Sequence, residues 1–363
     1  MNAVESVDLE DTDALIAADR DGLLRAASMA GALVRAVAAA RDEGALESLH
    51  GERPRTVVWV AGRGVARDAG AMLEATLGPV TAQPFVVADT APPWLGPLDV
   101  VIVAGDDAGD PALINAAAMG VRRGARVVVA APFEGPLRDS TGGRAAVLSP
   151  RLSVPDEFGL SGYLAAGLAV AQAVDPRVSV DLGAMADELD HEALRNSAGR
   201  ELFTNPAKML AERLSGPGMV LAGDSAATVA LARHGSALLA RVARRAVGAA
   251  GLADVVVALR SASSVDFRER SLFHDDDIDG PLPERLRALA LTLSGDRNAV
   301  AARTVGLDDL SLLGAADVPD LSDPASLPAG SVAEPAVSGV ELELAVLAVR
   351  LQMAAAYLRL VRG

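Results

Sequence analysis

Short apolar runs alternate with longer amphipathic stretches along most of this chain. Residues 56–61 read Thr-Val-Val-Trp-Val-Ala, a composition typical of a strand buried on both faces. Apolar residues then recur at helical spacing from Val65 to Leu77, and Gly78 ends that stretch. The pattern predicts a strand, a turn containing Gly62 and Gly64, and a helix. Unpaired amides at such a helix start form a natural anion site, although a purely structural turn gives the same pattern.

The same plan continues to about residue 174. Pro111 suits the first position of a helix and Gly124 suits its end. Strands that alternate with helices at this spacing predict a parallel, doubly wound sheet. Further strands are expected at 85–87, 99–104, 126–130 and 145–148, and further helices at 111–123 and 157–174.

The second half repeats this arrangement. Gly223-Asp224-Ser225 follows an apolar run at 219–222, much as Gly62-Arg63-Gly64 follows the first strand. Helices are expected at 206–214, 226–247 and 283–293, and a further strand at 253–259. The predicted fold class is therefore α/β, with two doubly wound parallel-sheet subdomains.

Helical segments are expected at both ends of the chain. Residues 12–50 predict one long helix or two short ones, with a break near Asp19 to Gly22. Residues 315–339 contain four prolines and predict an extended loop. The predicted divisions are an N-terminal helical segment 1–54, subdomains 55–178 and 179–314, the Pro/Ser-rich loop 315–339 and a C-terminal helix 340–363.

Composition excludes several kinds of function. The 363 residues carry a net charge of −15, which argues against general nucleic-acid binding because that needs a basic surface. There are no cysteines, so disulfides, thiolate metal sites and cysteine nucleophiles are excluded. No run of about 18 uncharged apolar residues occurs, and the acidic N-terminus lacks a signal-peptide profile. A cytoplasmic protein without a membrane span is expected.

Several stretches together resemble a known family. Asn205 to Glu212 is the most specific, and it is accompanied in order by 19–24, 58–64, 122–127, 149–151 and 355–358. The series resembles the sugar isomerase (SIS) fold, and within it the bifunctional phosphoglucose/phosphomannose isomerase family. The resemblance implies aldose–ketose isomerisation of a sugar phosphate or another carbohydrate derivative, no cofactor, and a homodimer with its site between subunits.

The phosphate loop departs from that family. Its members carry a Ser-x-Ser-Gly-Asn-Thr-Glu-like loop, whereas this chain has Ala-Gly-Asp-Asp-Ala-Gly-Asp at 104–110. Carboxylates have replaced the hydroxyls, and two like charges at 4 Å cost about 4 kcal/mol at an effective dielectric near 20. The family's Gly-Met-Gly-Gly-Ser-like turn also loses its serine, because Gly62-Arg63-Gly64-Val65-Ala66 stands there. We therefore expect that the loop does not hold phosphate in the family's way.

The catalytic motifs depart as well. The family's Glu-Asn pair corresponds to the region 237–242, which contains no acid, and its later Asn-His-Asn-Glu-like segment has no counterpart. No catalytic residue is assigned. Two functions stay open, a sugar-phosphate isomerase-family protein with degenerate motifs, or a non-catalytic carbohydrate-binding or regulatory protein. The positions expected to bind a ligand are Gly62, Arg63, Gly64, Asp107, Gly109, Gly223, Ser225 and Arg233.

Individual charged residues allow more than one interpretation. Arg233, with Arg241, Arg244 and Arg245, could clamp an anion or form a solvated basic helix face. His234 could replace the missing acid or be an ordinary histidine, and Lys208 is expected to support its helix. The acidic stretch 274–279 lacks the spacing of a calcium loop, so a solvated loop and no metal site are expected.

Overall fold

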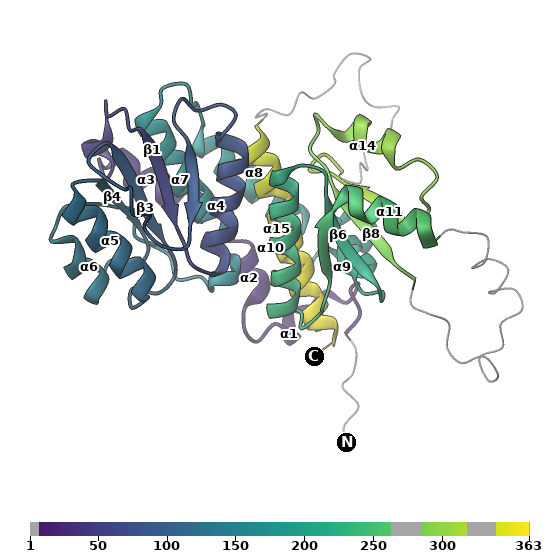
Figure 1. Ribbon diagram of the computed structural model, residues 1–363. Helices are drawn as coiled ribbons and strands as arrows, with labels where there is room; N and C mark the ends of the chain where they lie inside the picture. The colour runs from purple at the N-terminus through teal and green to yellow at the C-terminus, as the bar shows by residue number, and fades with distance from the viewer. Residues whose placement is uncertain (1–6, 263–284, 318–338, 363) are drawn as a thin grey trace, which may run out of the picture.

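Two parallel β-sheets form the framework of this protein (Figure 1). The computed structural model describes residues 7–262, 285–317 and 339–362. The first sheet has five strands in the order β2-β1-β3-β4-β5, and the second has four in the order β7-β6-β8-β9. Every strand pair is parallel. The predicted fold class of two α/β subdomains is confirmed.

The first sheet agrees with the sequence pattern. Its central strands are fully buried because helices cover both faces, which explains their β-branched composition. Val57, Trp59 and Ile102 face one core, whereas Val58 and Val103 face the other. The strands are β1 (Thr56–Val60), β2 (Phe85–Ala88), β3 (Asp99–Ala104), β4 (Arg126–Ala130) and β5 (Ala145–Val147).

Helices pack on both faces of this sheet, as Figure 1 shows. On one face α4 (Gly64–Leu77) and α7 (Leu160–Val174) lie together, with α3 (Ala30–Asp42) packed on α7. On the other face lie α5 (Pro111–Arg123) and α6 (Gly135–Thr141). The sequence pattern predicted α4, α5 and the main part of α7 but not α6, which is only seven residues long. A short 3-10 turn, η2 (Asp156–Phe158), precedes α7.

The prediction of a strand at 253–259 is wrong. That segment belongs to helix α11 (Leu252–Ala262), and the strand is β7 (Gly248–Gly251), just before it. Three consecutive valines at 255–257 favoured a strand, yet burial of Leu252, Val255 and Leu259 follows helical spacing. The glycines and alanines of β7 carry almost no strand propensity, so pairing with β6 (Met219–Gly223) decides its conformation.

The prediction of a helix at 283–293 is also wrong, because residues 287–291 form strand β8 (Arg287–Leu291). Its leucines and alanines are good helix formers, but they alternate between two cores. Helix α10 (Ala226–Arg241) ends earlier than expected. Unexpected elements are α8 (Leu182–Arg195), α14 (Arg297–Arg303) and β9 (Leu310–Leu313), whereas α9 (Pro206–Leu214) was expected.

The C-terminal helix α15 (Val340–Arg362) lies between the two sheets beside α10 (Figure 1). It is long and apolar enough to cross a membrane, but 89% of its most apolar window is buried inside this protein. A helix buried in the core of a globular protein has the same apolar composition as a membrane-spanning helix. Arg350 of α15 is fully buried and pairs with Glu192 of α8 at 2.8 Å. The apolar surface of α15 is thus covered within its own chain, and the homodimer stays a prediction.

The N-terminal segment forms three helices rather than one or two. They are α1 (Thr12–Ala18), α2 (Leu23–Ala27) and α3, and the predicted break at Asp19 to Gly22 lies between the first two. Asp19 caps α2 by accepting from the backbone of Leu23 and Leu24. The acidic stretch 274–279 and most of the Pro/Ser-rich loop lie outside the described residues.

Candidate functional site

A cavity of about 490 Å³ lies at the carboxyl edge of the first sheet. Strands β3, β4 and β5 end there, and this edge is where open parallel sheets bind ligands. We call it the edge cavity, and its lining includes Asp106, Pro132, Ser149, Tyr163 and Val37. A second hollow of about 360 Å³, the junction cavity, lies between α4 and α10. Asp106 and Asp156 line both cavities.

The start of helix α4 is occupied by the protein's own carboxylate. Gly64 has a φ of +68°, a left-handed conformation that favours glycine. A side chain there would lie 3.1 Å from Oδ2 of Asp156, and the backbone N–H of Val65 donates to that same carboxylate. Asp156 therefore lies where the first glycine turn would place an anion, and ligand binding at this turn stays a prediction.

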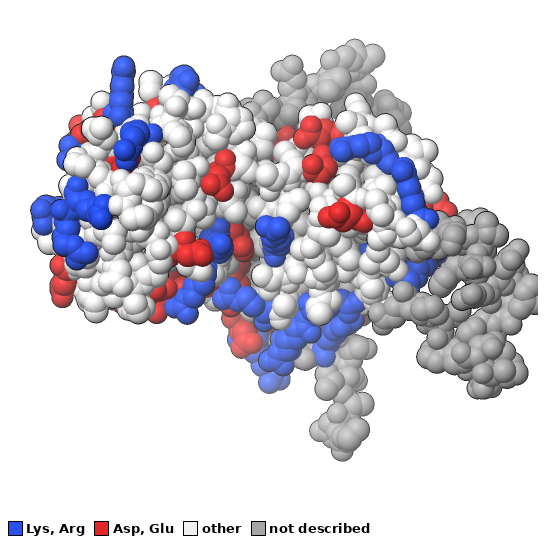
Figure 2. Space-filling model, viewed as in Figure 1, with Lys and Arg blue, Asp and Glu red and all other residues white. Residues whose placement is uncertain are grey.

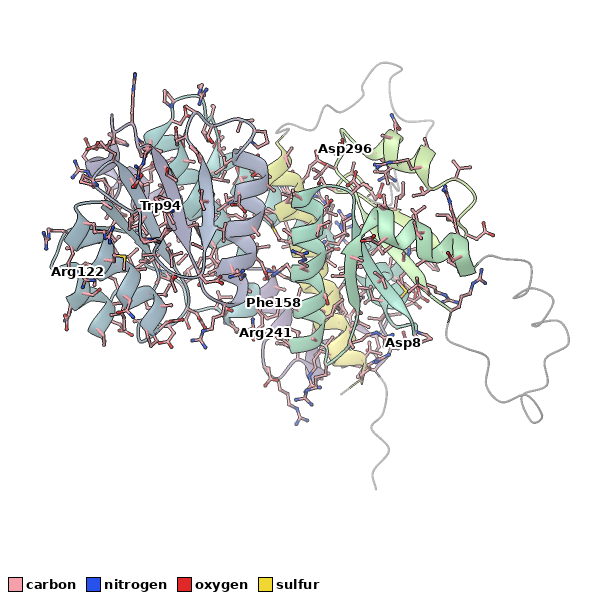
Figure 3. The ribbon with its side chains drawn as sticks, viewed as in Figure 1. Asp8, Trp94, Arg122, Phe158, Arg241 and Asp296 are labelled. Carbon is pink, nitrogen blue, oxygen red and sulfur yellow. The ribbon has the colours of Figure 1, made fainter. Side chains whose placement is uncertain are left out.

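Asp156 lies in an unusual electrostatic environment. Its side chain is 11% exposed and accepts from Arg241 at 3.3 Å. Burial, and then the nearby charge of Asp106, raise the pKa of this carboxyl above its ordinary value, while Arg241 and Val65 oppose that rise. Arg241 also pairs with Glu157 at 2.8 Å, so its charge is shared between two acids. Figure 3 labels Arg241 and Phe158 where the two halves meet.

The loop 105–110 binds the arginine of the first turn. Arg63 pairs with Asp107 at 3.3 Å and with Asp110 at 3.5 Å. Asp107 also accepts from the backbone of Gly109 at 2.7 Å, and Asp110 caps α5. Three predicted ligand positions, Arg63, Asp107 and Gly109, are thus brought together, but their polar groups bind one another. Figure 2 shows acidic and basic side chains side by side along the junction of the two halves.

The backbone at Gly62 has room for a side chain, so the turn does not require glycine at this position. A side chain at this position would have its nearest neighbours at 3.8 and 3.9 Å, which is ordinary contact. Of the two glycines in the first turn, only Gly64 has a positive φ. The role of Gly62 and Gly64 in the approach of a ligand stays a prediction.

At the second glycine turn, helix α10 packs directly against the turn and leaves no space for a ligand at Gly223. A side chain on Gly223 would lie 2.3 Å from the backbone nitrogen of Val229, so this glycine lets α10 pack tightly on β6. Ser225 and Thr228 cap α10 reciprocally. Gly223 and Ser225 do not line the two cavities, and neither does Arg233, which is exposed on α10. The structure therefore does not join these three predicted positions to Arg63 and Asp107.

A buried histidine lines the junction cavity. Nδ1 of His234 lies 3.0 Å from Asp68 of α4, and the His234 side chain is 1% exposed. An ionised carboxylate only accepts, so Nδ1 carries a proton toward Asp68. Its Nε2 atom has no hydrogen-bond partner among the described residues. Lys208, by contrast, donates to the carbonyls of Ala198 and Arg200, which agrees with the structural role expected of it.

The most distinctive site residues, Asp156 and Tyr163, were missed by sequence reasoning. Each stands about 50 residues along the chain from loop 105–110 and belongs to no motif of its own. The available signal was position, because Asp156 precedes the helix that follows the last strand of the first sheet. Such a helix start lies at the carboxyl edge of a parallel sheet.

Comparison with known proteins supports the fold. No protein-family description and no curated protein matches the sequence. Among solved structures, a candidate phosphosugar isomerase from Bacillus subtilis is 17% identical, with a TM-score of 0.59 over 92% of this chain and 95% of that one. A similar candidate from Silicibacter pomeroyi is 13% identical, with the same TM-score and coverage.

A third structure is the C-terminal domain of glucosamine-fructose-6-phosphate aminotransferase from Francisella tularensis. It is 11% identical, with a TM-score of 0.58 over 94% of this chain and 95% of that domain. These likenesses show that the chain has the two-sheet sugar isomerase (SIS) fold along nearly its whole length. The narrower resemblance to bifunctional phosphoglucose/phosphomannose isomerases stays a prediction.

Proposed function

We propose that this protein binds a sugar derivative in the edge cavity and isomerises it by moving a proton between neighbouring carbons. One observation carries the proposal: Asp156, Asp106 and Tyr163 line the same cavity at the carboxyl edge of the first sheet. Aldose–ketose isomerisation needs a base beside the reacting carbons. The segment that corresponds to the family's catalytic Glu-Asn pair, residues 237–242, contains no acid.

Asp156 has the properties of such a base. It is mostly buried, lines the cavity, and has a pKa raised by burial and by Asp106. A carboxylate with a raised pKa accepts a proton more readily, and such groups gather at functional sites. Arg241 and the N–H of Val65 hold the carboxylate in one orientation. A substrate carbon in the cavity beside Asp156 would face this group.

Tyr163 supplies a donor. Burial raises the pKa of its hydroxyl well above the ordinary value, and the nearby charges of Asp156 and Asp106 add to that effect. The group therefore stays a phenol at neutral pH and can donate a hydrogen bond to a substrate oxygen. Such a donor stabilises the charge that develops on the sugar oxygen as a proton leaves the neighbouring carbon.

The proposed substrate is not held through a phosphate in loop 105–110. Arg63 already pairs with two carboxylates there, and the exposed Asp106 has no protein partner among the described residues. A phosphate dianion in the loop would meet that carboxylate without a cation between them. We therefore expect negligible isomerisation of glucose 6-phosphate and mannose 6-phosphate.

Isotope exchange tests the isomerase directly. The protein is incubated in D₂O with a panel of aldoses and ketoses, free and derivatised, and loss of the hydrogen beside the carbonyl is followed by NMR. We expect exchange with at least one sugar, and a loss of about 100-fold or more in Asp156→Asn, as for removal of a general base. Glu157→Gln is the matched control, since Glu157 pairs with the same arginine but lies outside the edge cavity.

The second candidate is a non-catalytic carbohydrate-binding protein. The observation that favours it is the structural use of Asp156, which caps α4 through Val65 and pairs with Arg241. A sugar that raises the melting temperature of the protein but shows no isotope exchange would support this candidate and contradict the isomerase.

A further inference from the structure

Arginines line the amino edge of the first sheet, opposite the carboxyl edge that borders the edge cavity. Arg55 immediately precedes β1, Arg126 begins β4 and Arg144 immediately precedes β5, and the parallel register brings these starts to one edge. Helix α5 connects two parallel strands and so runs back along them, which brings Arg122 and Arg123 at its end to the same edge. We call this surface the arginine edge; it consists of Arg53, Arg55, Trp94, Leu98, Arg122, Arg123, Arg126 and Arg144.

The positive charge of the arginine edge is only partly neutralised. Arg55 pairs with Asp99 at 2.6 Å, and Arg126 pairs with Glu52. The other arginines of this surface have no ion pair with an acid among the described residues, and Arg123 donates only to backbone carbonyls. All of these arginines are exposed. Figure 2 shows basic side chains gathered at the outer end of this half, in a protein whose net charge is −15.

An exposed tryptophan lies among these charges. Trp94 is 46% exposed, and Leu98 of the same loop is 68% exposed. The guanidinium of Arg55 lies 5.8 Å from the centre of the Trp94 ring and donates to the Trp94 carbonyl at 3.3 Å. The backbone N–H of Arg55 donates to the Leu98 carbonyl at 2.7 Å. The loop is therefore fixed while two apolar side chains face solvent, and Figure 3 shows Trp94 and Arg122 on the same half of the molecule.

This combination is typical of a protein interface. Tryptophan and arginine often dominate the binding energy there, and a fixed aromatic anchor loses little conformational entropy on binding. A small ligand is the poorer fit, because side chains as exposed as Trp94 and Leu98 project from the surface and do not enclose a pocket. An anionic membrane is also the poorer fit. Its plane meets the wider surface of an acidic protein, whereas a narrow segment meets only the arginine edge.

We propose that the arginine edge binds an acidic segment of a partner protein. An apolar side chain of that segment packs on Trp94 and Leu98, and its carboxylates pair with the arginines that lack an acid. Charges in solution are screened beyond about 8 Å at physiological ionic strength, so the net charge of −15 does not prevent this local attraction. The partner docks opposite the edge cavity, so this proposal goes beyond the proposed function and does not depend on it.

Three synthetic peptides test the two parts of this contact. Calorimetry with the full chain compares a Glu-Leu repeat with a Gln-Leu repeat, which lacks the charge, and with a Glu-Ser repeat, which lacks the apolar group. We expect each replacement to weaken binding about tenfold. Tryptophan emission locates the contact, because Trp94 is exposed whereas the only other tryptophan, Trp59, is fully buried. Binding of the Glu-Leu peptide should shift this emission and should weaken as salt is raised.

Variants assign the binding to this surface. Arg122→Gln combined with Arg144→Gln removes two unpaired charges and should weaken binding of the Glu-Leu peptide about fivefold. Arg20→Gln combined with Arg213→Gln is the matched control, because both arginines are exposed, have no ion pair among the described residues and lie outside the arginine edge. Trp94→Ser should remove the advantage of Glu-Leu over Glu-Ser and leave the dependence on charge.

Four results would overturn the proposal. Two are equal affinities for the Glu-Leu and Gln-Leu peptides, and a loss in the control pair as large as in the Arg122 and Arg144 variant. Vesicles of phosphatidylglycerol and phosphatidylcholine that shift the tryptophan emission when the Glu-Leu peptide does not would identify a membrane surface instead. Self-association that the Arg122 and Arg144 substitutions abolish would identify a second copy as the occupant. These measurements involve no sugar, so their failure is distinct from a failure of the isotope-exchange experiment.

Discussion

The two glycine turns are similar in sequence and opposite in use. Each follows a buried parallel strand and starts a helix, α4 after Gly64 and α10 after Ser225. At the first turn the helix start lines the junction cavity, and a carboxylate from residue 156 lies over it. At the second turn Ser225 and Thr228 satisfy the helix start themselves.

This difference shows that a strand, a glycine turn and a helix do not by themselves define a site. What distinguishes the first turn is the segment that packs above it. Residues 149–163 bring Asp156 and Tyr163 over the sheet edge and leave space beside them. The second turn has instead a tight approach of α10 to β6 at Gly223.

The largest expected effect is on stability at the second turn. Gly223→Ala would place a side chain against the backbone of residues 228 and 229, and such overpacking costs about 3 kcal/mol. Gly62→Ala, the matched change at the first turn, meets nothing closer than 3.8 Å and should change the free energy of unfolding by less than about 0.5 kcal/mol. Urea unfolding measures both. Equal losses would mean that the two turns are packed alike.

Removing the acids of loop 105–110, which lies beside the first turn, should change the charge of the ligand that binds there. Replacing Asp106 and Asp107 with Ser removes two negative charges and restores hydroxyls, so we expect glucose 6-phosphate to bind about tenfold more tightly. The measurement is calorimetry, with Asp139→Ser as the control for an exposed aspartate outside the loop. Unchanged affinity would place any phosphate site elsewhere.

Helix capping should matter at one turn only. Ser225→Ala removes the side-chain cap of α10 and should cost about 1 kcal/mol of unfolding free energy. Arg63, at the corresponding position before α4, makes no side-chain cap, so Arg63→Ala should cost less. Thermal unfolding of the two variants gives the comparison, and a larger loss for Arg63→Ala would reverse it.

The smallest expected effect is a difference in pH dependence between two carboxylates. The folded-state pKa of Asp156 is raised, because burial and Asp106 disfavour its charged form. The folded protein then binds more protons than the unfolded chain, so this group lowers stability as pH rises from its ordinary pKa of 3.8 through the higher folded pKa. Asp156→Asn should remove that slope.

Glu192 should behave in the opposite way. Its burial would raise its pKa, but the Arg350 pair and the other partners prevail and lower it. Its contribution to stability is therefore present above the ordinary pKa of 4.5 and is lost as pH falls through the lower folded pKa. Unfolding free energies measured across the acid range in Asp156→Asn and Glu192→Gln should show slopes that change with opposite sign.

Sequence reasoning succeeded where burial and propensity agree. The β-branched strands of the first sheet are buried on both faces, so composition and tertiary packing point the same way. It failed at β7 and β8, whose glycine, alanine and leucine residues carry little strand preference. Strand pairing determines those segments, and a single sequence does not display it.

The candidate site was predictable to a similar degree. Arg63, Asp107 and Gly109 are near one another because consecutive strands of a parallel sheet end at the same edge. Asp156 comes from a distant segment whose position depends on how α7 packs on the sheet, and no local pattern specifies it. Gly223 and Ser225 lie apart from the first turn's cavities, because similar local sequences do not report which segment covers them, and their role in ligand binding stays a prediction.

Hydrogen exchange with bound sugar tests the central claim most directly. The protein is saturated with the sugar derivative that raises its melting temperature most, and amide exchange is followed by mass spectrometry. We predict slower exchange in peptides that cover residues 61–68 and 149–163, and no change in the peptide that covers 223–229. Protection at the second turn with none at the first would contradict the account.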